Sequence, residues 1–382
     1  MAVTGGHIRD TVMRAGFLAL ICCLSSSAFP RGDDGLVQVR AEGYADGIGF
    51  AARRRAVEAA TRDAVAQFVQ SLVAREDAAA LEPLLGDPGR YVDHADLLRQ
   101  EDRGDSTFVE VDVYVAERSI QRDVAELMLP RLGAAPEVLL VIGEQFIQDE
   151  VPAVIEGGIA EQALIEALGK KGVAARGVDA VPDDFSHPEL LGAVGGDVET
   201  GGLFARAMTA DVVVLGTAVA RTTAIAAGSN LLRNEAAITL RVFRAFDGKM
   251  TDALSSRHVV HAADPRAGGR QALRDAALRL AEDARVSAVI TVLGTRAEEG
   301  VQLTLERPGT RARLEKVLGA IRGVPGVAGM EERFYSDRLA RYVFQYTGPM
   351  SWLVDEVRDR SFDGAPLKVM RVVGNEMRLS FP

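Results

Sequence analysis

Residues 36–73 constrain the fold more than any other part of this chain, because two apolar periodicities meet in them. Apolar residues first alternate with polar ones, as in a half-buried strand, and from Ala51 they recur with helical spacing. Three glycines lie between the two patterns: Gly43, Gly47 and Gly49. The sequence therefore predicts a strand, a glycine-rich bend and one long helix, whose alanine-rich face can pack closely against a sheet.

Two interpretations of the glycine-rich bend compete. Residues 47–52 fit the G-x-G-x-x-A fingerprint of dinucleotide-binding turns, and Arg53 could assist an anion at the start of the helix. That fingerprint requires a second strand ending in an acidic residue, but the helical pattern continues to Val73 and leads into alanine-, proline- and glycine-rich sequence. Positive charge at a helix N-terminus also opposes the helix dipole. We therefore expect the glycines only to turn the chain, Arg53 to face water, and no cofactor to bind.

Length and charge limit the classes of protein. With 382 residues, the chain is long enough for two or three domains. Its formal net charge is −10, which argues against non-specific nucleic-acid binding, because such binding needs clustered Lys and Arg. We expect no nucleic-acid partner.

The N-terminus has the parts of a secretory signal. Arg14 precedes an apolar run over residues 15–24, and small residues lead up to Ala28. We therefore predict a signal peptide over residues 1–28 with cleavage near Ala28. Met13 is an alternative to Met1 as the start of translation.

Both cysteines of the chain, Cys22 and Cys23, lie inside this apolar run. The mature chain would then contain no disulfide, no thiolate zinc site and no cysteine nucleophile. Ile21 precedes Cys22, which makes a poor lipobox, so a lipoprotein is the lesser alternative. No other stretch has the roughly 18 uninterrupted apolar residues of a spanning helix. We expect a periplasmic protein or one at the outer-membrane periphery, with peripheral membrane association as an option.

Residues 36–132 are predicted to form a first, small α+β module. A polar region rich in proline and glycine follows the long helix, and residues 107–115 then alternate as a strand. Residues 118–129 resume a helical pattern that stops at Pro130.

This first module resembles a known family. Its order is a strand with G-Y-A at Gly43, Tyr44 and Ala45, an acidic and glycine-containing bend, an Ala-Arg helix start, and later a V-E-V-D-V-Y-V strand. That order is similar to the N-terminal domain of flagellar assembly protein T and related LPP20-type envelope proteins. The resemblance implies a structural and assembly module without catalytic residues.

Residues 135–294 are predicted to form a central α/β module. The continuous apolar runs at residues 138–142 and 212–215 are typical of strands covered on both faces. Asp247 and Gly248 form a turn pair that favours a hairpin, and residues 267–293 predict a long helix.

The central module resembles the α/β domain of curli-secretion-channel-like lipoproteins and the N-terminal domain of TolB-like proteins. The segments that carry this likeness are A-D-V-V-V-L-G-T-A, the D-G hairpin with its flanking strands, and the helix with Q-A-L-R-D-A-A-L-R-L-A. The resemblance implies assembly or scaffolding.

The histidines offer no metal-ligating pattern. His258 and His261 are three residues apart on a predicted strand, which places them on opposite faces. The chain contains no H-E-x-x-H, no G-x-S-x-G and no G-x-x-x-x-G-K-[ST] segment. We predict no catalytic and no metal-binding residue.

Residues 298–382 are predicted to form a third module with the order β-α-β-β-α-β-β, a split β-α-β sandwich. It is either ferredoxin-like or similar, in fold only, to the ring-building modules of envelope secretion machines. Trp352 is the only tryptophan of the chain and lies on its predicted second helix.

The predicted fold class is thus α+β and α/β in three modules. Our leading hypothesis is a non-enzymatic exported protein that scaffolds a flagellar basal-body ring or a secretion channel, with envelope machinery proteins as partners and a homo-oligomer as its own state. The alternative is a periplasmic binding module for glycan, peptidoglycan or a small molecule. An NAD-type enzyme is the weakest hypothesis. The residues proposed for partner contact or packing are Gly43, Tyr44, Gly47, Gly49, Arg53 and Trp352.

Overall fold

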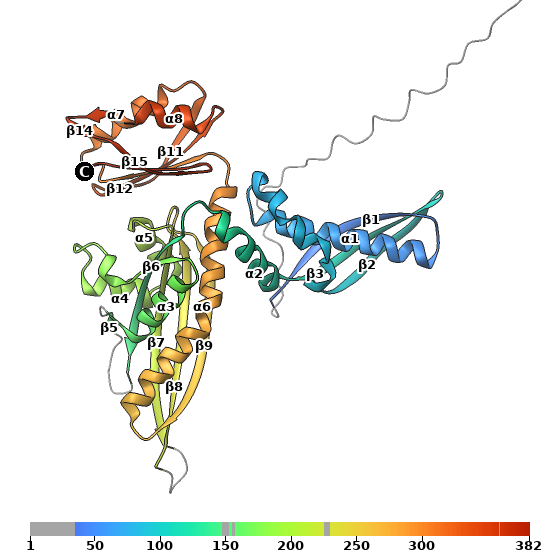
Figure 1. The fold of residues 1–382 in the computed structure, drawn as a ribbon, viewed down its shortest axis with the longest axis horizontal. Helices are drawn as coiled ribbons and strands as arrows, with labels where there is room; N and C mark the ends of the chain where they lie inside the picture. The colour runs from blue at the N-terminus through green and yellow to red at the C-terminus, as the bar shows by residue number, and fades with distance from the viewer. Residues whose placement is uncertain (1–34, 147–152, 155–156, 225–229, 359) are drawn as a thin grey trace, which may run out of the picture.

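A computed structural model describes residues 35–146, 153–154, 157–224, 230–358 and 360–382 (Figure 1). The predicted signal peptide, its cleavage site and the possible lipidation site lie outside the described residues. In Figure 1 the first module extends sideways as an arm, the middle module forms the long body, and the third module covers one end of that body. The mixture of helices with parallel and antiparallel sheets confirms the predicted α+β and α/β fold class.

The first module is a three-stranded antiparallel sheet with one long helix on it. The strands are β1 (Leu36–Asp46), β2 (Val92–Arg103) and β3 (Ser106–Ala116), in the order β1-β3-β2. Helix α1 (Phe50–Ser71) lies on β1 and β3, and α2 (Glu117–Met128) leads out of the module. The predicted strand, bend and helix at its start are confirmed.

Strand β2 was missed by the sequence patterns. The region after α1 forms two 3₁₀ segments, Arg75–Gly86 and Pro88–Tyr91, and then the twelve-residue strand β2. Nearly every residue of β2 is exposed, because it is an edge strand that α1 does not cover. A strand with no buried face shows no alternation of apolar and polar residues.

Gly43 allows α1 to lie directly against β1. A Cβ atom at this position would be 1.9 Å from the carbonyl oxygen of Ala56 and 2.9 Å from the amide nitrogen of Ala60. Four buried alanines at four-residue steps form the contacting face of the helix: Ala52, Ala56, Ala60 and Ala64. The two backbones therefore pack more closely than any side chain at residue 43 permits.

We predict that Gly43→Ala destabilises the protein by about 1–3 kcal/mol, because the added methyl group overlaps helix backbone that cannot rotate away. Gly86→Ala is the control, because a Cβ atom there meets nothing within 4 Å. Urea unfolding of both variants measures the difference. Equal stabilities would show that α1 and β1 do not pack as described.

The middle module is built on one mixed sheet. Its order is β5-β4-β7-β8-β9, with β6 also paired to β4. Strand β4 runs parallel to β6 and β7, whereas β7, β8 and β9 are antiparallel neighbours. The strands are β4 (Glu137–Gln145), β5 (Ala153–Val154), β6 (Ala174–Arg176), β7 (Val212–Ala224), β8 (Leu232–Arg244) and β9 (Met250–Ala262).

Helices cover both faces of the middle sheet. On one face lie α3 (Ile159–Lys170) and the 33-residue α6 (Pro265–Ala297); on the other lie α4 (His187–Gly195) and α5 (Val198–Ala207), after a short 3₁₀ turn at Val178–Ala180. Leu140 of β4 belongs to the first core, and its neighbours Leu139 and Val141 belong to the second. The prediction that this apolar strand is covered on both sides is confirmed.

The first and middle modules share one continuous core, because α2 packs against α6. A polar contact lies beside this packing. Arg118 of α2 donates two hydrogen bonds of 2.6 Å to the carboxylate of Asp252 on β9, and Ser287 of α6 bonds the same carboxylate. We call this contact the first joint.

The third module has a core of its own. Its sheet order is β11-β12-β10-β16-β15, with β10 and β16 parallel. The predicted order of elements is found, with a small extra hairpin after the second helix. In the five-stranded sheet, β16 lies between β10 and β15. The elements are β10 (Val301–Glu306), α7 (Arg311–Arg322), β11 (Val327–Tyr335), β12 (Leu339–Tyr346), α8 (Met350–Val357), β13 (Ser361–Phe362), β14 (Ala365–Pro366), β15 (Lys368–Val373) and β16 (Glu376–Ser380).

Candidate functional site

A cluster of buried charge lies where the third module meets the middle module. Parallel strands β4 and β7 begin at the same edge of the middle sheet, which brings Glu137 and Asp211 together. The sheet of the third module lies over this edge with its polar face, which carries Arg341, Arg371 and Arg378 on three different strands. We call this contact the arginine joint.

Asp211 is the acceptor at the centre of the arginine joint. Arg378 donates to its Oδ1 at 2.8 Å, and Arg371 donates to its Oδ2 at 2.9 Å. Arg378 also donates to the carboxylate of Glu137 at 2.8 Å. The side chains of Asp211, Arg378 and Arg371 are only 7%, 8% and 10% exposed. The joint therefore consists of ion pairs largely removed from water.

These contacts decide the ionisation of the cluster. Burial lowers the pKa of Arg371 and of Arg378, but the surrounding carboxylates, Asp211 first among them, together outweigh it and raise both pKa values above the usual range. Burial raises the pKa of Glu376, which lies farther from the arginines, with 3.7 Å between its carboxylate and Arg371. Both arginines keep their charge at any physiological pH.

Arg341 joins the modules through backbone carbonyls, with no carboxylate partner among the described residues. It is 2% exposed and donates to three backbone carbonyls of the middle module, at Arg206 (2.9 Å), Met208 (2.8 Å) and Ala245. Burial lowers the pKa of Arg341 to about 9, so it remains charged at neutral pH. Its guanidinium therefore links the third module to the backbone at the end of α5 and just after β8.

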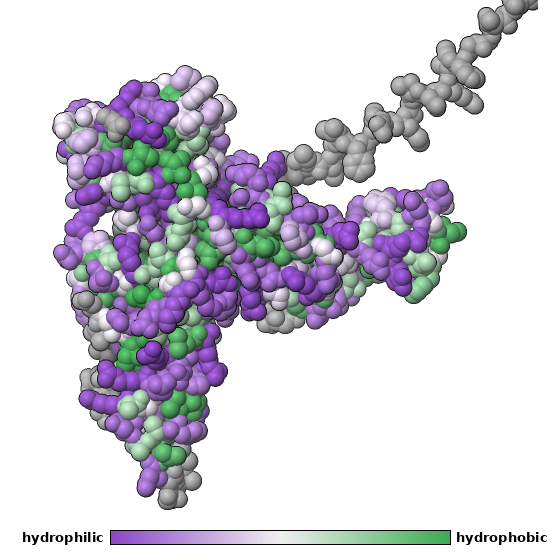
Figure 2. Space-filling view, viewed as in Figure 1, coloured by the Kyte–Doolittle hydropathy of each residue, from purple (hydrophilic) through white to green (hydrophobic). Residues whose placement is uncertain are grey.

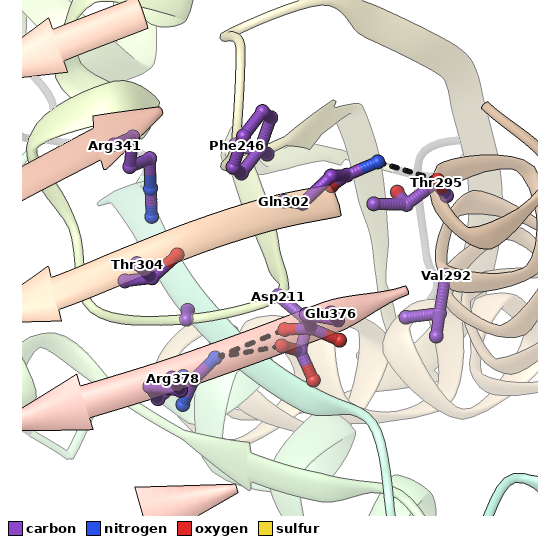
Figure 3. A pocket seen from close by; sticks show the side chains of 10 residues that line it. Asp211, Phe246, Val292, Thr295, Gln302, Thr304, Arg341, Glu376 and Arg378 are labelled. Atoms are coloured by element: carbon purple, nitrogen blue, oxygen red, sulfur yellow. Dashed lines mark hydrogen bonds and ion pairs between the residues drawn. The ribbon is translucent and has the colours of Figure 1, made fainter. Parts of the chain in front are cut away.

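A small cavity of about 20 Å³ lies within the arginine joint (Figure 3). Figure 3 shows Asp211, Glu376 and Arg378 on one side of it and Arg341 and Gln302 on the other. Gln302 donates to the carbonyl oxygen of Thr295 at the end of α6. The cavity thus has polar side chains on two sides, and Ala210, Phe246 and Val292 also line it.

A much larger cleft, of about 1010 Å³, lies between the arm and the middle module. It is bounded by the C-terminal end of α1, by α2, by the start of β9 and by the last turns of α6. Seven amide and hydroxyl side chains line it: Gln67, Gln70, Ser71, Gln121, Thr251, Ser287 and Thr291. Six charged side chains line it as well: Arg75, Arg244, Lys249, Asp252, Glu298 and Glu299. The cleft therefore offers both neutral and charged hydrogen-bonding groups.

A third polar cluster lies at the opposite edge of the middle sheet, where α3 begins. Glu144 is 4% exposed and accepts a hydrogen bond from the amide nitrogen of Ala160 at 2.6 Å. Glu161 is 2% exposed, and its Oε2 has no hydrogen-bond partner among the described residues. Burial and then the nearby charge of Glu144 raise the pKa of Glu161 to about 7.

The glycines of the fingerprint turn the chain from β1 into α1. Gly47 and Gly49 both have positive φ angles, of 93° and 87°. The amide of Gly47 bonds the carbonyl of Asp105 at 2.6 Å, and its carbonyl accepts from Thr107 at 2.9 Å. The neighbour of β1 is the antiparallel β3, so the adjacent parallel strand of a dinucleotide-binding turn is not formed here.

The other sequence-predicted residues do not gather at one place. Gly43 lies under α1, Arg53 is exposed on the first turn of α1, and Tyr44 is 54% exposed on β1. Trp352 is 67% exposed on α8, in the third module. None of these residues lines the cavity of the arginine joint.

The two histidines of β9, His258 and His261, lie in different surroundings, as expected for opposite faces of a strand. His258 Nε2 lies 3.4 Å from the carboxylate of Asp275 on α6, whereas His261 is exposed. Within the described part of the chain, no group of three or more His, Cys, Asp or Glu side chains is arranged to hold a metal ion. Over the same residues, no helix is both long and apolar enough to cross a membrane.

No protein-family profile and no curated protein sequence matches this chain. Among solved structures, a PelC dodecamer from Paraburkholderia phytofirmans is 12% identical and matches 39% of this chain and 88% of its own, with a TM-score of 0.25. Lipoprotein GNA1162 from Neisseria meningitidis is 13% identical over 38% of this chain and 96% of its own, with a TM-score of 0.24. Protein XCC0632 from Xanthomonas campestris is 10% identical over 41% of this chain and 86% of its own, also with a TM-score of 0.24. At these scores the likenesses carry no argument about this chain.

Proposed function

We propose that this chain is an exported, non-enzymatic envelope protein that scaffolds or stabilises a large assembly, with a flagellar basal-body ring and a secretion channel as the candidate machines. The observation that carries the proposal is where the protein places its buried charge. Asp211, Arg341, Arg371 and Arg378 bind one module to the next, and Arg118 with Asp252 does the same at the first joint.

Such joints suit a component that must keep a fixed shape. Interfaces between domains of one chain are usually small and permit relative motion. Here α2 packs on α6 at one joint, and arginines from three strands hold carboxylates and carbonyls at the other. Directional hydrogen bonds of this kind fix one orientation of the modules, which we propose is the geometry used in assembly.

The tip of the arm supplies a surface for contact with a second copy. Ile48, in the turn between β1 and α1, is 65% exposed, and Phe50, the first residue of α1, is 81% exposed. Figure 2 shows hydrophobic residues at this far end of the arm. In the described part of the chain, β1 and β2 form the two edges of the three-stranded sheet, and both extend toward the same tip. Apolar side chains beside open strand edges favour association between copies.

We predict that Ile48→Ser combined with Phe50→Ser lowers self-association while changing the free energy of unfolding by less than about 0.5 kcal/mol, because both side chains are exposed. Leu203→Ser, at a residue 52% exposed on α5 of the body, is the matched control. Sedimentation velocity over a range of concentrations measures the association. If the tip variant and the control associated equally, the arm tip would not be the surface through which copies associate.

Cell fractionation and gene deletion test the function itself. We expect the mature protein to sediment with envelope fractions, and its deletion to impair motility or secretion. A protein found only in the soluble periplasm, together with a deletion strain that swims and secretes normally, would contradict the proposal.

The large cleft favours a second candidate, a periplasmic module that binds a glycan or peptidoglycan fragment. Its volume suits a ligand of several sugar units, and its amides and hydroxyls, interspersed with charged side chains, suit hydroxyl-rich molecules that also carry polar or charged groups. A thermal-shift screen with muropeptides and soluble glycans tests it. A bound ligand at 100 times its Kd stabilises by about 2.7 kcal/mol, so an unchanged Tm across the screen would exclude this candidate.

A further inference from the structure

Strand β2 is an open edge of the arm. Among the described residues it pairs only with β3, and α1 lies mainly on β1 and β3. Two apolar side chains at its middle, Leu97 and Leu98, are 38% and 46% exposed. A twelve-residue open edge is a template for a further strand unless its side chains reject one. Its charges therefore decide which strand β2 accepts.

A bulge in β2 brings two opposite charges onto one face of the strand. Asp96 lies opposite Asp112 of β3. Arg99 lies opposite Glu110, because Leu98 is an extra residue in this register. Residues 110 and 112 are two apart on a regular strand and share a face, so Asp96 and Arg99 share that face too. Without the bulge, a separation of three residues would place them on opposite faces.

Asp96 lacks a cation of its own. Among the described residues, no cation pairs with its carboxylate. Its neighbour across the strands, Asp112, carries the same charge and is already held by Arg40 at 2.9 Å and Gln38 at 2.7 Å. Like charges directly opposite each other on adjacent strands repel. A cation supplied from outside the arm would offset this repulsion.

A second copy of β2 supplies that cation. If two β2 strands pair antiparallel about a two-fold axis at the bulge, Asp96 of each strand lies opposite Arg99 of the other. On the same face, His94 of each strand lies opposite Glu101 of the other. The two exposed leucines of each bulge meet at the axis. Opposite charges in such cross-strand positions stabilise the pairing of strands.

The same charges reject the neighbouring registers. A pairing shifted by two residues in one direction places Asp96 opposite Asp96 of the other copy. The shift in the other direction places Arg99 opposite Arg99. A shift by one residue would turn the side chains of one strand to the other face. In the favoured register the like charges of Asp93 and Asp102 come together only near the ends of the strands. Charge on this edge thus selects one partner and one register.

We propose that the arms of two copies join through β2 into one six-stranded antiparallel sheet, with the two-fold axis at Leu97 and Leu98. Both α1 helices then lie on the same side of the sheet, because a two-fold axis perpendicular to a sheet preserves its faces. The contact is separate from the arm tip at Ile48 and Phe50, so one copy can hold two neighbours. The inference rests on the proposed function, since it names a surface through which the scaffold associates.

Charge reversal on the strand tests the pairing and its register. Asp96→Arg and Arg99→Asp should each weaken dimerisation by about tenfold or more, because both Asp–Arg pairs of the dimer become pairs of like charge. The double variant should regain wild-type association, since its charges are exchanged. Glu58→Arg is the control for Asp96→Arg, because it changes the net charge equally at a side chain 65% exposed on α1. Sedimentation velocity over a range of concentrations gives the dimer Kd of each protein.

A cysteine at the axis provides a second measurement that does not depend on charge. Both native cysteines lie in the predicted signal peptide, so the chain from residue 29 has none. Leu98→Cys should form a disulfide between copies under mild oxidation, because residue 98 of each copy lies at the axis. Leu278→Cys on α6 is the matched control, since both leucines are 46% exposed.

Three outcomes overturn the β2 pairing: reversals that leave dimerisation unchanged, a double variant that stays weak, and a Leu98→Cys protein that cross-links no more than the control. The scaffold proposal would survive each of them if the wild type still associates and the Ile48→Ser, Phe50→Ser variant associates less. A wild-type protein that stays monomeric at every concentration would overturn both proposals.

Discussion

Replacing Asp211 by Asn is expected to destabilise the protein by about 3–5 kcal/mol, the cost typical of removing one partner from a buried ion pair. Asn has nearly the same shape as Asp but no charge, so Arg371 and Arg378 would keep their positions and lose the carboxylate that both of them bond. Glu137 would remain as a hydrogen-bond partner of Arg378, and Glu376 would be the carboxylate left near Arg371, at 3.7 Å. The two guanidinium groups would then repel each other in a site that water hardly reaches.

The matched control lies at the same boundary between modules. Asp184 pairs with Arg338 of the third module, but the two side chains are 55% and 47% exposed. Asp184→Asn should therefore cost less than about 1 kcal/mol. Urea unfolding gives both free energies, and limited proteolysis at residues 298–300, between α6 and β10, reports release of the third module. Similar losses in the two variants would mean that Asp211 does not organise the joint.

The stability of the protein should fall as pH rises from about 4.5 to about 7, and Glu161→Gln should make that fall smaller. Burial raises the pKa of Glu161 in the folded protein from its usual 4.5 to about 7. Between these values the folded state holds a proton that the unfolded state has released, so raising the pH favours unfolding. The difference of about 2.5 pKa units corresponds to about 3 kcal/mol, fully expressed above pH 7. Gln mimics the protonated carboxyl and should make the protein more stable than wild type at pH 8.

Glu166→Gln is the control for this pH dependence. It removes a carboxylate from the same helix, α3, at a position where the side chain is 56% exposed. Its unfolding free energy should follow the wild-type slope between pH 4.5 and 8. If Glu161→Gln also retained that slope, the titrating group would lie elsewhere in the protein.

Sequence patterns predicted the elements that have one buried face or two. The alternation at the start of β1, the helical stripe of α1 and the continuous apolar runs of β4 and β7 all correspond to buried side chains in the structure. Asp247 and Gly248 lie between β8 and β9 as predicted, with Gly248 at a positive φ of 75°. Burial imposes these periodicities directly, so they can be recognised in one sequence.

The arginine joint could not be predicted in the same way. Arg341, Arg371 and Arg378 alternate with core residues along their strands, and a charged residue in that position usually faces water. They are buried because a second module covers their side of the sheet. Contacts between modules leave no periodic pattern in either partner, so the sequence indicated neither Asp211 nor its arginines.

The buried carboxylates at the start of α3 escaped prediction for a related reason. Glu144 ends an apolar strand and Glu161 lies in the first turn of a helix, which are both ordinary positions for acidic residues. Gly177 packs directly against the carboxyl group of Glu161. A Cβ atom on this glycine would lie 2.3 Å from Glu161 Oε1. This tertiary contact helps to remove the carboxyl group from water.

The most direct test of the scaffold proposal is the assembly state of the full mature protein extracted from its native envelope. Sedimentation velocity combined with chemical cross-linking should detect a homo-oligomer that loses mass when Ile48 and Phe50 are replaced by Ser. A monodisperse monomer at every concentration, with no cross-links between copies or to envelope proteins, would contradict the account.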